Sequence, residues 1–387
     1  MEAVENAYLT ELSENQIIIR DTIRNFAENN IRPHIMEYDE SQKFPMEIMR
    51  QLGELGFLGI VIPEEYGGAG LGYVDFVIII EELAKVDPSI ALSVAAHNGL
   101  CTNHIYRFGN EIQRKKYLPD LTCGNKIGAW GLTESSSGSD AASLKSTAEK
   151  KNGYYILNGS KTFTTHGTVG ETAVVTAITD KTKGKKGISA FILEKGWEGF
   201  IAGKKGNKLG MRASDTTQLT FDNCKVPEEN LIGNEGEGFI QTMQILEGGR
   251  ISIAALSIGL AQGAFYAASK YSKERKQFGK PLAEFEAIQF KLADMHTNIE
   301  AARMLTYRAA ALKDKGMPNK KESAEAKLFS SETAEKAAND AVQIFGGYGF
   351  IKDFPVEKFY RDVKLLTIGE GTSEIQRIVI ARELLQD

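Results

Sequence analysis

The spacing of apolar residues changes twice along this chain, and that change limits what it can fold into. From Leu12 to about Gly124 apolar side chains recur every three or four residues, which favours helices. From about Lys126 to Gly233 short β-branched and aromatic runs alternate with loops rich in Gly and Lys, which is typical of strands. The helical spacing returns at Gly238 and continues to the C-terminus. We therefore expect a helical region, a β region and a second helical region, in that order.

The same patterns predict individual elements. Pro33 should end the first long helix, and Phe44-Pro45-Met46 should open another that reaches Leu55. A short strand should begin after Gly153 and close in a turn at Asn158-Gly159. The other predicted strands cover residues 172–179, 188–193 and 218–221, and four long helical segments cover about 238–273, 281–313, 321–346 and 370–385. Four long helices with short connections predict a bundle. The expected units are residues 1–125, 126–235 and 236–387, which together make an α+β protein.

Composition excludes several classes of protein. The 387 residues include 46 Lys and Arg against 51 Asp and Glu, a formal net charge of −5, so no basic surface for a nucleic acid is expected. The longest apolar run, Ile251–Ala261, is shorter than the ~20 residues that span a bilayer, and we expect no membrane insertion. The acidic start, Met1–Asn6, lacks the parts of a signal peptide. The expected location is the cytoplasm of a bacterium, or the mitochondrial matrix for a mature organellar form.

The sequence also lacks the common motifs of metal, hydrolase and phosphate chemistry. Five histidines show no H-E-x-x-H pattern and three cysteines form no C-x-x-C pair, so neither a metal site nor a redox pair is expected. No G-x-S-x-G elbow or Walker-type phosphate loop is present. The cluster Gly67–Gly72 fails the G-x-G-x-x-G pattern because Tyr73 stands at the third glycine position, and it is interpreted as a surface loop.

Three segments could carry chemistry, and each also has a purely structural interpretation. Glu370 lies between Gly369 and Gly371 just before a helix, where glycines permit close approach and free N–H groups can meet an anion or a carbonyl oxygen. The alternative is a plain helix start capped by Thr372 or Ser373. The segment 130–140, rich in hydroxyl groups and glycine, could bind a polar heteroaromatic ring or phosphate, or could be a solvated loop. The basic and aromatic segment 274–280 could hold a pyrophosphate, or could be a solvated helix end.

Taken in order, these segments resemble the acyl-CoA dehydrogenase family over essentially the whole chain. The motifs that carry the resemblance are Leu132-Thr133-Glu134 through Gly138-Ser139-Asp140, Asn158-Gly159-Ser160-Lys161, Phe163-Thr164-Thr165, Leu209–Thr216, Val226-Pro227, Gly236–Phe239, Glu274-Arg275 with Phe278-Gly279, Gln343–Gly349 and Glu370-Gly371-Thr372. Each motif is weak alone, but their order together with the α–β–α pattern is highly specific.

The resemblance implies an N-terminal α-helical domain, a middle β-barrel or sandwich domain and a C-terminal four-helix bundle that together hold FAD. It implies oxidation of an acyl-CoA to a trans-2-enoyl-CoA, in which Glu370 removes the α-proton and the flavin takes the β-hydride. The family polarises the thioester carbonyl with the backbone N–H of this glutamate and a flavin hydroxyl. Some members instead carry the base on the first bundle helix, where this chain has Gly249, so Glu370 remains the base and Glu247 is the only rival.

The resemblance also implies the other site residues and partners. The residues expected to contact the cofactor are Trp130, Leu132, Thr133, Gly138, Ser139, Phe163, Thr164, Thr165, Arg275, Gln277, Phe278, Gln343, Gly346, Gly347, Thr372 and Glu374. Those expected to contact the substrate are Ser139, Arg250 and Gly371. Arg275, Gln277 and Phe278 resemble residues that hold the FAD of a neighbouring subunit, which implies a homotetramer built as a dimer of dimers. Electron-transfer flavoprotein is the implied electron acceptor.

Departures from the family pattern bear on specificity. Gly369 stands where tyrosine is usual, so we expect a wider acyl pocket that tolerates branched short chains. The run Ser135-Ser136-Ser137 replaces a Pro-Gly-Ala-like run, Phe163 replaces a common tryptophan, and Glu286 replaces a frequent glutamine and is left out of the cofactor set. The bundle motif Gln289–Met295 resembles the short-chain (butyryl) branch, and Ala91 stands where a dicarboxylyl substrate would need arginine. The alternatives are a branched short-chain dehydrogenase, a flavin oxidase or monooxygenase on the same fold, and a catalytically silent binding relative.

Overall fold

The computed structural model describes residues 12–385, so the prediction made on Met1–Asn6 lies outside the described residues. The first region is helical, as the spacing predicts. Its α-helices are α2 (Glu14–Phe26), α3 (Ile35–Ser41), α4 (Met46–Glu54), α5 (Tyr73–Ala84), α6 (Pro88–Ala96), α7 (Asn103–Phe108) and α8 (Glu111–Thr122). Pro33 does not end the helical path as predicted. It lies in a 3₁₀ turn, Arg32–His34, that leads directly into α3, because its missing N–H is tolerated in the first turn of a helix.

The middle region folds into a sheet that contains eight of the described strands. They are β1 (Gly128–Gly131), β2 (Thr147–Lys151), β3 (Tyr154–Thr165), β4 (Thr172–Ile178), β5 (Ile188–Glu194), β6 (Phe200–Ala202), β7 (Thr216–Pro227) and β8 (Leu231–Ile232). The order is β6-β7-β3-β2-β4-β5-β8, and β1 pairs with β4 in parallel. The turn predicted at Asn158-Gly159 is wrong, because β3 continues through it. The register with β7 shifts there instead, which marks a β-bulge that uses the φ of +139° at Gly159.

The C-terminal region contains three long helices and two shorter ones. These are α9 (Gly238–Glu274), α10 (Glu286–Asp314), α11 (Lys320–Phe345), α12 (Val356–Asp362) and α13 (Ser373–Leu384). Pattern alone did not predict α12, which follows Pro355. By length and composition α9 could cross a membrane, but 83% of its most apolar window is buried inside the protein, as in the core helix of a soluble protein. Its small, apolar residues therefore serve packing.

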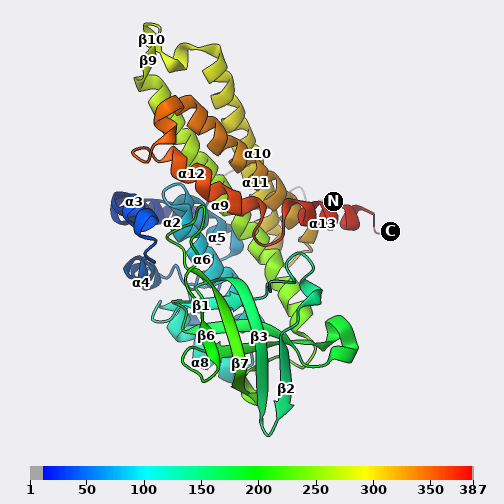
Figure 1. Cartoon of the computed structure of the whole chain (residues 1–387). Coiled ribbons are helices and arrows are strands. Elements are labelled where there is room, and N and C mark those ends of the chain that lie inside the picture. Colours follow the sequence, from blue (N-terminus) through cyan, green and yellow to red (C-terminus); the bar gives the residue numbers. More distant parts are fainter. Residues whose placement is uncertain (1–11, 386–387) are drawn as a thin grey trace.

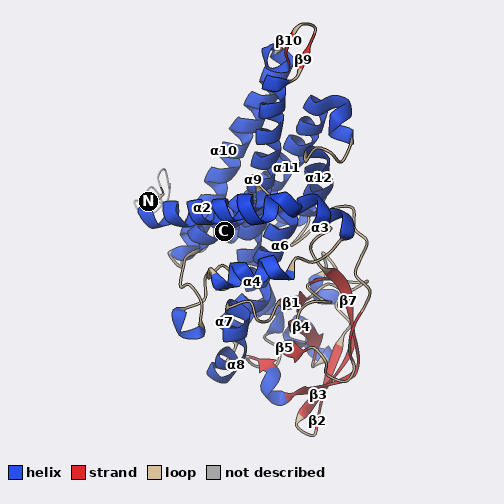
Figure 2. Ribbon diagram, turned by 90° about the vertical axis from the view of Figure 1, so that its left-hand side faces the viewer, coloured by secondary structure: helices blue, strands red, loops and turns tan. Residues whose placement is uncertain are grey.

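The hydrophobic core joins the first and third regions. One cluster includes Ile23, Ile79, Ile251, Ile299 and Leu366, so the N-terminal helices and the bundle share it. A separate cluster fills the sheet. At one end of the molecule lies the sheet, and at the other lies the small hairpin of β9 (Lys276–Gln277) and β10 (Lys280–Pro281) between α9 and α10 (Figure 1). The view turned by 90° shows the same separation (Figure 2).

Candidate active site

Glu370 lies at a strained turn between two helical segments. The turn follows the 3₁₀ stretch Val363–Thr367 and precedes α13. The N-cap of α13 is Thr372, one of the two residues predicted for that position. Glu370 and Gly371 both have positive φ, +53° and +94°. A left-handed conformation is costly for a residue with a β-carbon, so the surrounding structure must hold this turn in place. Gln376 does part of this, because its side-chain amide donates to the carbonyl of Glu370 at 3.3 Å and to that of Gly371 at 2.9 Å.

The carboxylate of Glu370 occupies the space left by a missing side chain on α9. A β-carbon added at Gly249 would overlap Oε2 of Glu370. This oxygen is buried and has no hydrogen-bond partner among the described residues. Burial raises the pKa of Glu370 to about 7, against the opposing charges of Lys327 and Arg250. A carboxylate whose pKa is near neutrality and whose oxygen Oε2 has no hydrogen-bond partner among the described residues is suited to general base catalysis.

Two buried cations lie near this carboxylate. Arg250 is 6% exposed, and within the described part of the chain its Nε and Nη1 atoms find no acceptor. Such donors are suited to an acceptor on a bound ligand, which agrees with the predicted substrate contact of Arg250. Lys327 on α11 is 0% exposed, and its Nζ donates to the carbonyl oxygen of Gly371 at 2.8 Å. Sequence reasoning missed both Lys327 and Gln376.

The loops predicted to contact the flavin ring are held by a buried ion pair. Nζ of Lys161 lies 2.7 Å from Oε1 of Glu134 and also donates to the carbonyl of Leu132 at 3.2 Å. Burial lowers the pKa of Lys161, although the charge of Glu134 opposes this effect. The backbone N–H of Thr162 donates to the carbonyl of Thr133 at 2.7 Å, so the predicted segments 132–133 and 163–165 lie side by side.

The surroundings of these loops fit a polar aromatic ligand. Phe163 has a φ of +55° and is 79% exposed, so its ring is available for stacking. The hydroxyl of Thr164 is buried and lacks a partner among the described residues, which leaves a hydrogen-bonding group for a ligand. Thr165 follows at the end of β3, and Gly138 and Ser139 lie on an exposed loop. The residues present therefore fit a flavin.

Trp130 is oriented by a chain of hydrogen bonds that sequence reasoning missed. Its indole N–H donates to Nδ1 of His104 at 3.1 Å, and Nε2 of His104 lies 3.1 Å from Oε1 of Gln241. Gln241 in turn donates to the carbonyl of Ile232 at 3.1 Å. Burial lowers the pKa of His104 to about 4, so the imidazole is neutral and the ring is fixed as an acceptor for the indole.

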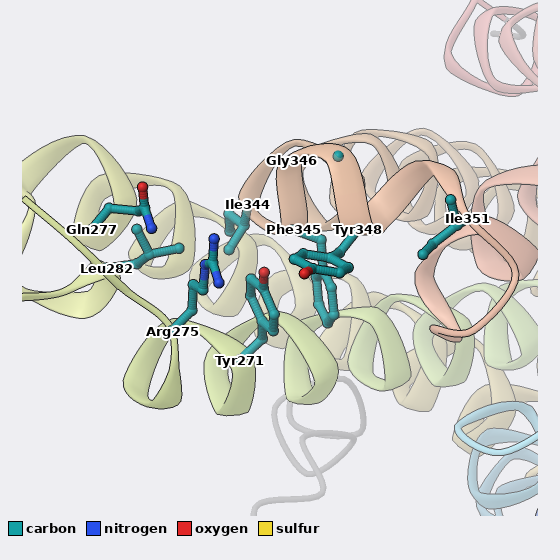
Figure 3. A pocket seen from close by; sticks show the side chains of 10 residues that line it. Tyr271, Arg275, Gln277, Leu282, Ile344, Phe345, Gly346, Tyr348 and Ile351 are labelled. Atoms are coloured by element: carbon teal, nitrogen blue, oxygen red, sulfur yellow. The ribbon is translucent and has the colours of Figure 1, made fainter.

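A second cluster of predicted residues surrounds a cavity of about 510 Å³ at the far end of the bundle (Figure 3). The predicted residues that line it are Arg275, Gln277, Gly346 and Gly347, and the others are Tyr271, Leu282, Ile344, Phe345, Tyr348 and Ile351. The guanidinium of Arg275 lies 5.5 Å from the ring centre of Tyr348. Phe278 does not line this cavity and is 94% exposed, and Gln343 and Glu374 are also exposed.

One chain does not bring the two clusters together. Trp130 packs against the apolar cluster that contains Ile245 of α9, whereas Arg275 directly follows the last residue of that helix. At a rise of 1.5 Å per residue, the thirty steps from Ile245 to Arg275 span about 45 Å. That separation exceeds the length of one dinucleotide cofactor. Figure 1 shows the same arrangement, with β1 at one end of α9 and β9 at the other.

Comparison with known proteins identifies the family. The N-terminal, middle and C-terminal domain models of acyl-CoA dehydrogenase match residues 13–125, 129–224 and 236–385. The chain therefore belongs to the acyl-CoA dehydrogenase family, whose members are oxidoreductases. Within the described residues, no group of three or more His, Cys, Asp or Glu side chains could hold a metal ion.

Its relatives include short-chain enzymes. The chain is 47% identical over 375 residues to the short-chain specific acyl-CoA dehydrogenase of Clostridium acetobutylicum, covering 97% of this chain and 99% of that one. The structure of butyryl-CoA dehydrogenase from Megasphaera elsdenii matches with a TM-score of 0.95 at 43% identity, over 97% of this chain and 99% of that one.

Two further structures bear on electron transfer and on the cofactor. A chain from a structure titled electron transferring flavoprotein of Acidaminococcus fermentans matches with a TM-score of 0.96 at 48% identity, over 98% of this chain and 100% of that chain. The FAD complex of PigA matches with a TM-score of 0.93 at 30% identity, over 97% of this chain and 98% of that one.

Proposed function

We propose that this chain catalyses the α,β-dehydrogenation of short-chain acyl-CoA thioesters to trans-2-enoyl-CoA, with Glu370 as the base. The observation that carries this proposal is the position of the Glu370 carboxylate, which fills the space above Gly249. One of its oxygens, Oε2, is buried and has no hydrogen-bond partner among the described residues. The short-chain relatives support the substrate class. The three units, residues 1–125, 126–235 and 236–387, are part of the same proposal.

The residues divide the work between the base and the binding of the thioester. Glu370 accepts the α-proton on its carboxylate, and its pKa of about 7 lets this group be ionised at neutral pH yet hold a proton. The backbone N–H of Glu370 donates to the thioester carbonyl, which lowers the energy of the carbanion-like transition state. Arg250, with two buried donors, binds the substrate together with Ser139 and Gly371. FAD, when bound, supplies the acceptor for the β-hydride.

FAD is placed by two chains in this proposal. One chain holds it through the start of α13, with Thr372 and Glu374, and through residues of the middle region: Trp130, Leu132, Thr133, Gly138, Ser139, Phe163, Thr164 and Thr165. The bundle-end residues Arg275, Gln277, Gly346 and Gly347 of a neighbour hold its pyrophosphate and adenosine, with Phe278 and Gln343 beside them. The separation of the two clusters by about 45 Å within one chain supports this sharing. The 94% exposure of Phe278 does so too, because a free aromatic side chain is suited to an interface. The proposed assembly is a homotetramer.

The structural relatives favour electron-transfer flavoprotein as the acceptor. Gly369 favours branched short-chain acyl-CoA as a second substrate, since it leaves open the place where tyrosine is usual. For location we propose the bacterial cytoplasm, or the mitochondrial matrix for an organellar form. A flavin oxidase on the same fold differs in its reaction with oxygen, so rapid reoxidation of the reduced holoenzyme in air would favour an oxidase instead.

One experiment tests the assignment. The purified yellow holoenzyme is mixed anaerobically with a panel of acyl-CoAs, and bleaching of the flavin is followed for the native protein, Glu370→Gln and Glu247→Gln. We expect butyryl-CoA to bleach the native protein and Glu247→Gln. Glu370→Gln should lose at least about 100-fold in rate, since removing an acid–base group costs about 10²–10⁴-fold. Native bleaching by Glu370→Gln would overturn the assignment. A purified protein without a flavin spectrum would favour a silent binding relative.

A further inference from the structure

Lys327 is unusual because it is a lysine with no exposed surface at all. It lies on α11 at 0% exposure, among small buried residues of the same helix face such as Ser323, Ser331 and Ala334. The buried lysines Lys161 and Lys358 pair with carboxylates, whereas within the described residues no carboxylate forms a salt bridge with Lys327. Its Nζ instead donates to the carbonyl oxygen of Gly371, at 2.8 Å.

This hydrogen bond fixes the turn that carries Glu370. Gly371 has a φ of +94° and directly follows Glu370 at +53°, so two consecutive residues are left-handed. Their carbonyls are held from two sides, by Lys327 from α11 and by Gln376 from α13. Without these donors the turn would relax toward a less strained conformation, and the carboxylate would leave the space above Gly249.

We propose that Lys327 is a positioning residue for the catalytic base, holding the turn of Glu370 through the Gly371 carbonyl and favouring the ionised carboxylate through its charge. This inference rests on the proposed function and deepens it. The inference assigns two contributions to the side chain of Lys327, a geometric one through its hydrogen bond and an electrostatic one through its charge. The geometric contribution is shared with Gln376, which is neutral, whereas the electrostatic contribution belongs to Lys327 and Arg250.

The charged groups around Glu370 and its two neighbouring cations, Lys327 and Arg250, come from three helices. Lys327 and Glu332 lie on α11, Arg250 and Glu247 on α9, and Glu374 on α13. Burial, with a smaller contribution from the charge of Arg250, lowers the pKa of Lys327 to about 8, while the charges of Glu370, Glu374 and Glu332 oppose this lowering. Lys327 is therefore protonated at neutral pH. Removing its charge should raise the pKa of Glu370, because one of the two cations that favour the carboxylate is gone.

The test separates proton abstraction from hydride transfer. Acetyl-CoA has α-protons but no β-hydrogen, so the holoenzyme can only exchange those protons: a C–H bond breaks, Glu370 takes the proton, and deuterium from D₂O returns to the carbon. We measure this exchange by NMR from about pH 5.5 to about pH 9.5, a range that brackets both a base titrating near neutrality and a midpoint about one pH unit higher. The variants are Lys327→Gln, which keeps a donor and removes the charge, and Gln376→Leu, which weakens the turn and leaves the charge. Lys364→Met, an exposed lysine at the same end of the bundle, is the control.

We expect Lys327→Gln to move the midpoint of the exchange profile upward by about one pH unit. Exchange at neutral pH should then fall about fivefold, because such a shift lowers the ionised fraction of Glu370 by that factor. Gln376→Leu should lower exchange at every pH without moving the midpoint, and Lys364→Met should match the native protein. A native midpoint and native rate in Lys327→Gln would overturn the inference. If Lys327→Gln does not fold, Gln376→Leu still tests the turn, since an unchanged exchange rate in that variant overturns the geometric part. Native exchange by Glu370→Gln would instead overturn the proposed base itself.

Discussion

Oxygen Oε2 of Glu370 lies where the β-carbon of residue 249 would be if that residue were not glycine. The proposed base, at the turn before α13, and the glycine backbone on α9 thus fit each other. In this chain the two positions therefore exclude each other. A side chain at residue 249 and the carboxylate of Glu370 compete for the same volume.

Gly249→Ala should therefore displace the base. Adding one methyl group pushes the Glu370 carboxylate out of its space, and misplacement by about 1 Å can cost about 100-fold in rate. We expect kcat for butyryl-CoA to fall by about that factor while the flavin content remains native. Steady-state kinetics with electron-transfer flavoprotein measure the effect. Ile240→Ala, at an exposed position on the same helix, is the control, and an alanine variant with native kcat would contradict the expected overlap.

Glu370 should also cost the protein stability at alkaline pH. Its folded pKa of about 7 lies above the ordinary glutamate pKa of 4.5, so folding favours the protonated form. The stabilisation is present below pH 4.5 and is lost as the pH rises through 7, and it amounts to at most about 3 kcal/mol. We expect the free energy of unfolding of Glu370→Gln, relative to that of the native protein, to increase as the pH rises from 4.5 through 7. Denaturant unfolding at several pH values measures this difference, and a constant difference would contradict it.

Gly369→Tyr should narrow substrate selection. A β-carbon at residue 369 meets only Leu365 at ordinary contact distances, 3.4 Å and more, so the backbone accepts a side chain there. We expect the ratio of kcat/KM for isobutyryl-CoA or isovaleryl-CoA to that for butyryl-CoA to fall about tenfold, a typical effect of one or two carbon atoms in an apolar pocket. Ile368→Tyr, at an exposed neighbouring position, should leave the ratio unchanged. An unchanged ratio in Gly369→Tyr would show that residue 369 does not limit the acyl pocket.

Lys161→Met should destabilise the loops at the flavin site. The substitution leaves Glu134 charged and buried without its partner, which typically costs about 3–5 kcal/mol. Burial acts to raise the pKa of Glu134, but the charge of Lys161 and hydrogen bonds from Ser146 and Lys145 hold that pKa below its usual value. We expect lower thermal stability and faster loss of FAD on dilution. The double variant Lys161→Met with Glu134→Leu should recover much of the stability, and no recovery would argue against an unpaired charge as the cause.

The sequence predicts the order of the elements, and it also points to Glu370 as the proposed base. Particular residues show which features could not be predicted. Glu370 is recognisable because glycines flank it before a helix. Lys327 is not recognisable as a site residue, because a lysine in an Ala- and Glu-rich helix usually faces water. Only its position on the same helix face as the small residues Ser323 and Ser331 could have indicated that it is buried. Asn158-Gly159 suggests a turn, yet pairing with β7 extends the strand through it, since tertiary hydrogen bonds outweigh a local preference. His104 is a lone histidine in sequence, and its link to Trp130 exists only in three dimensions.

The length of α9 has a genetic consequence. The first half of this helix carries Gly249 beside the proposed base of its own site, and the helix ends just before Arg275, which we assign to the site of a neighbour. A chain with Glu370→Gln and a chain with a damaged Arg275 should each be inactive alone. In a mixed pair, one shared site collects both defects and the other receives neither, so two inactive alleles expressed together should restore activity.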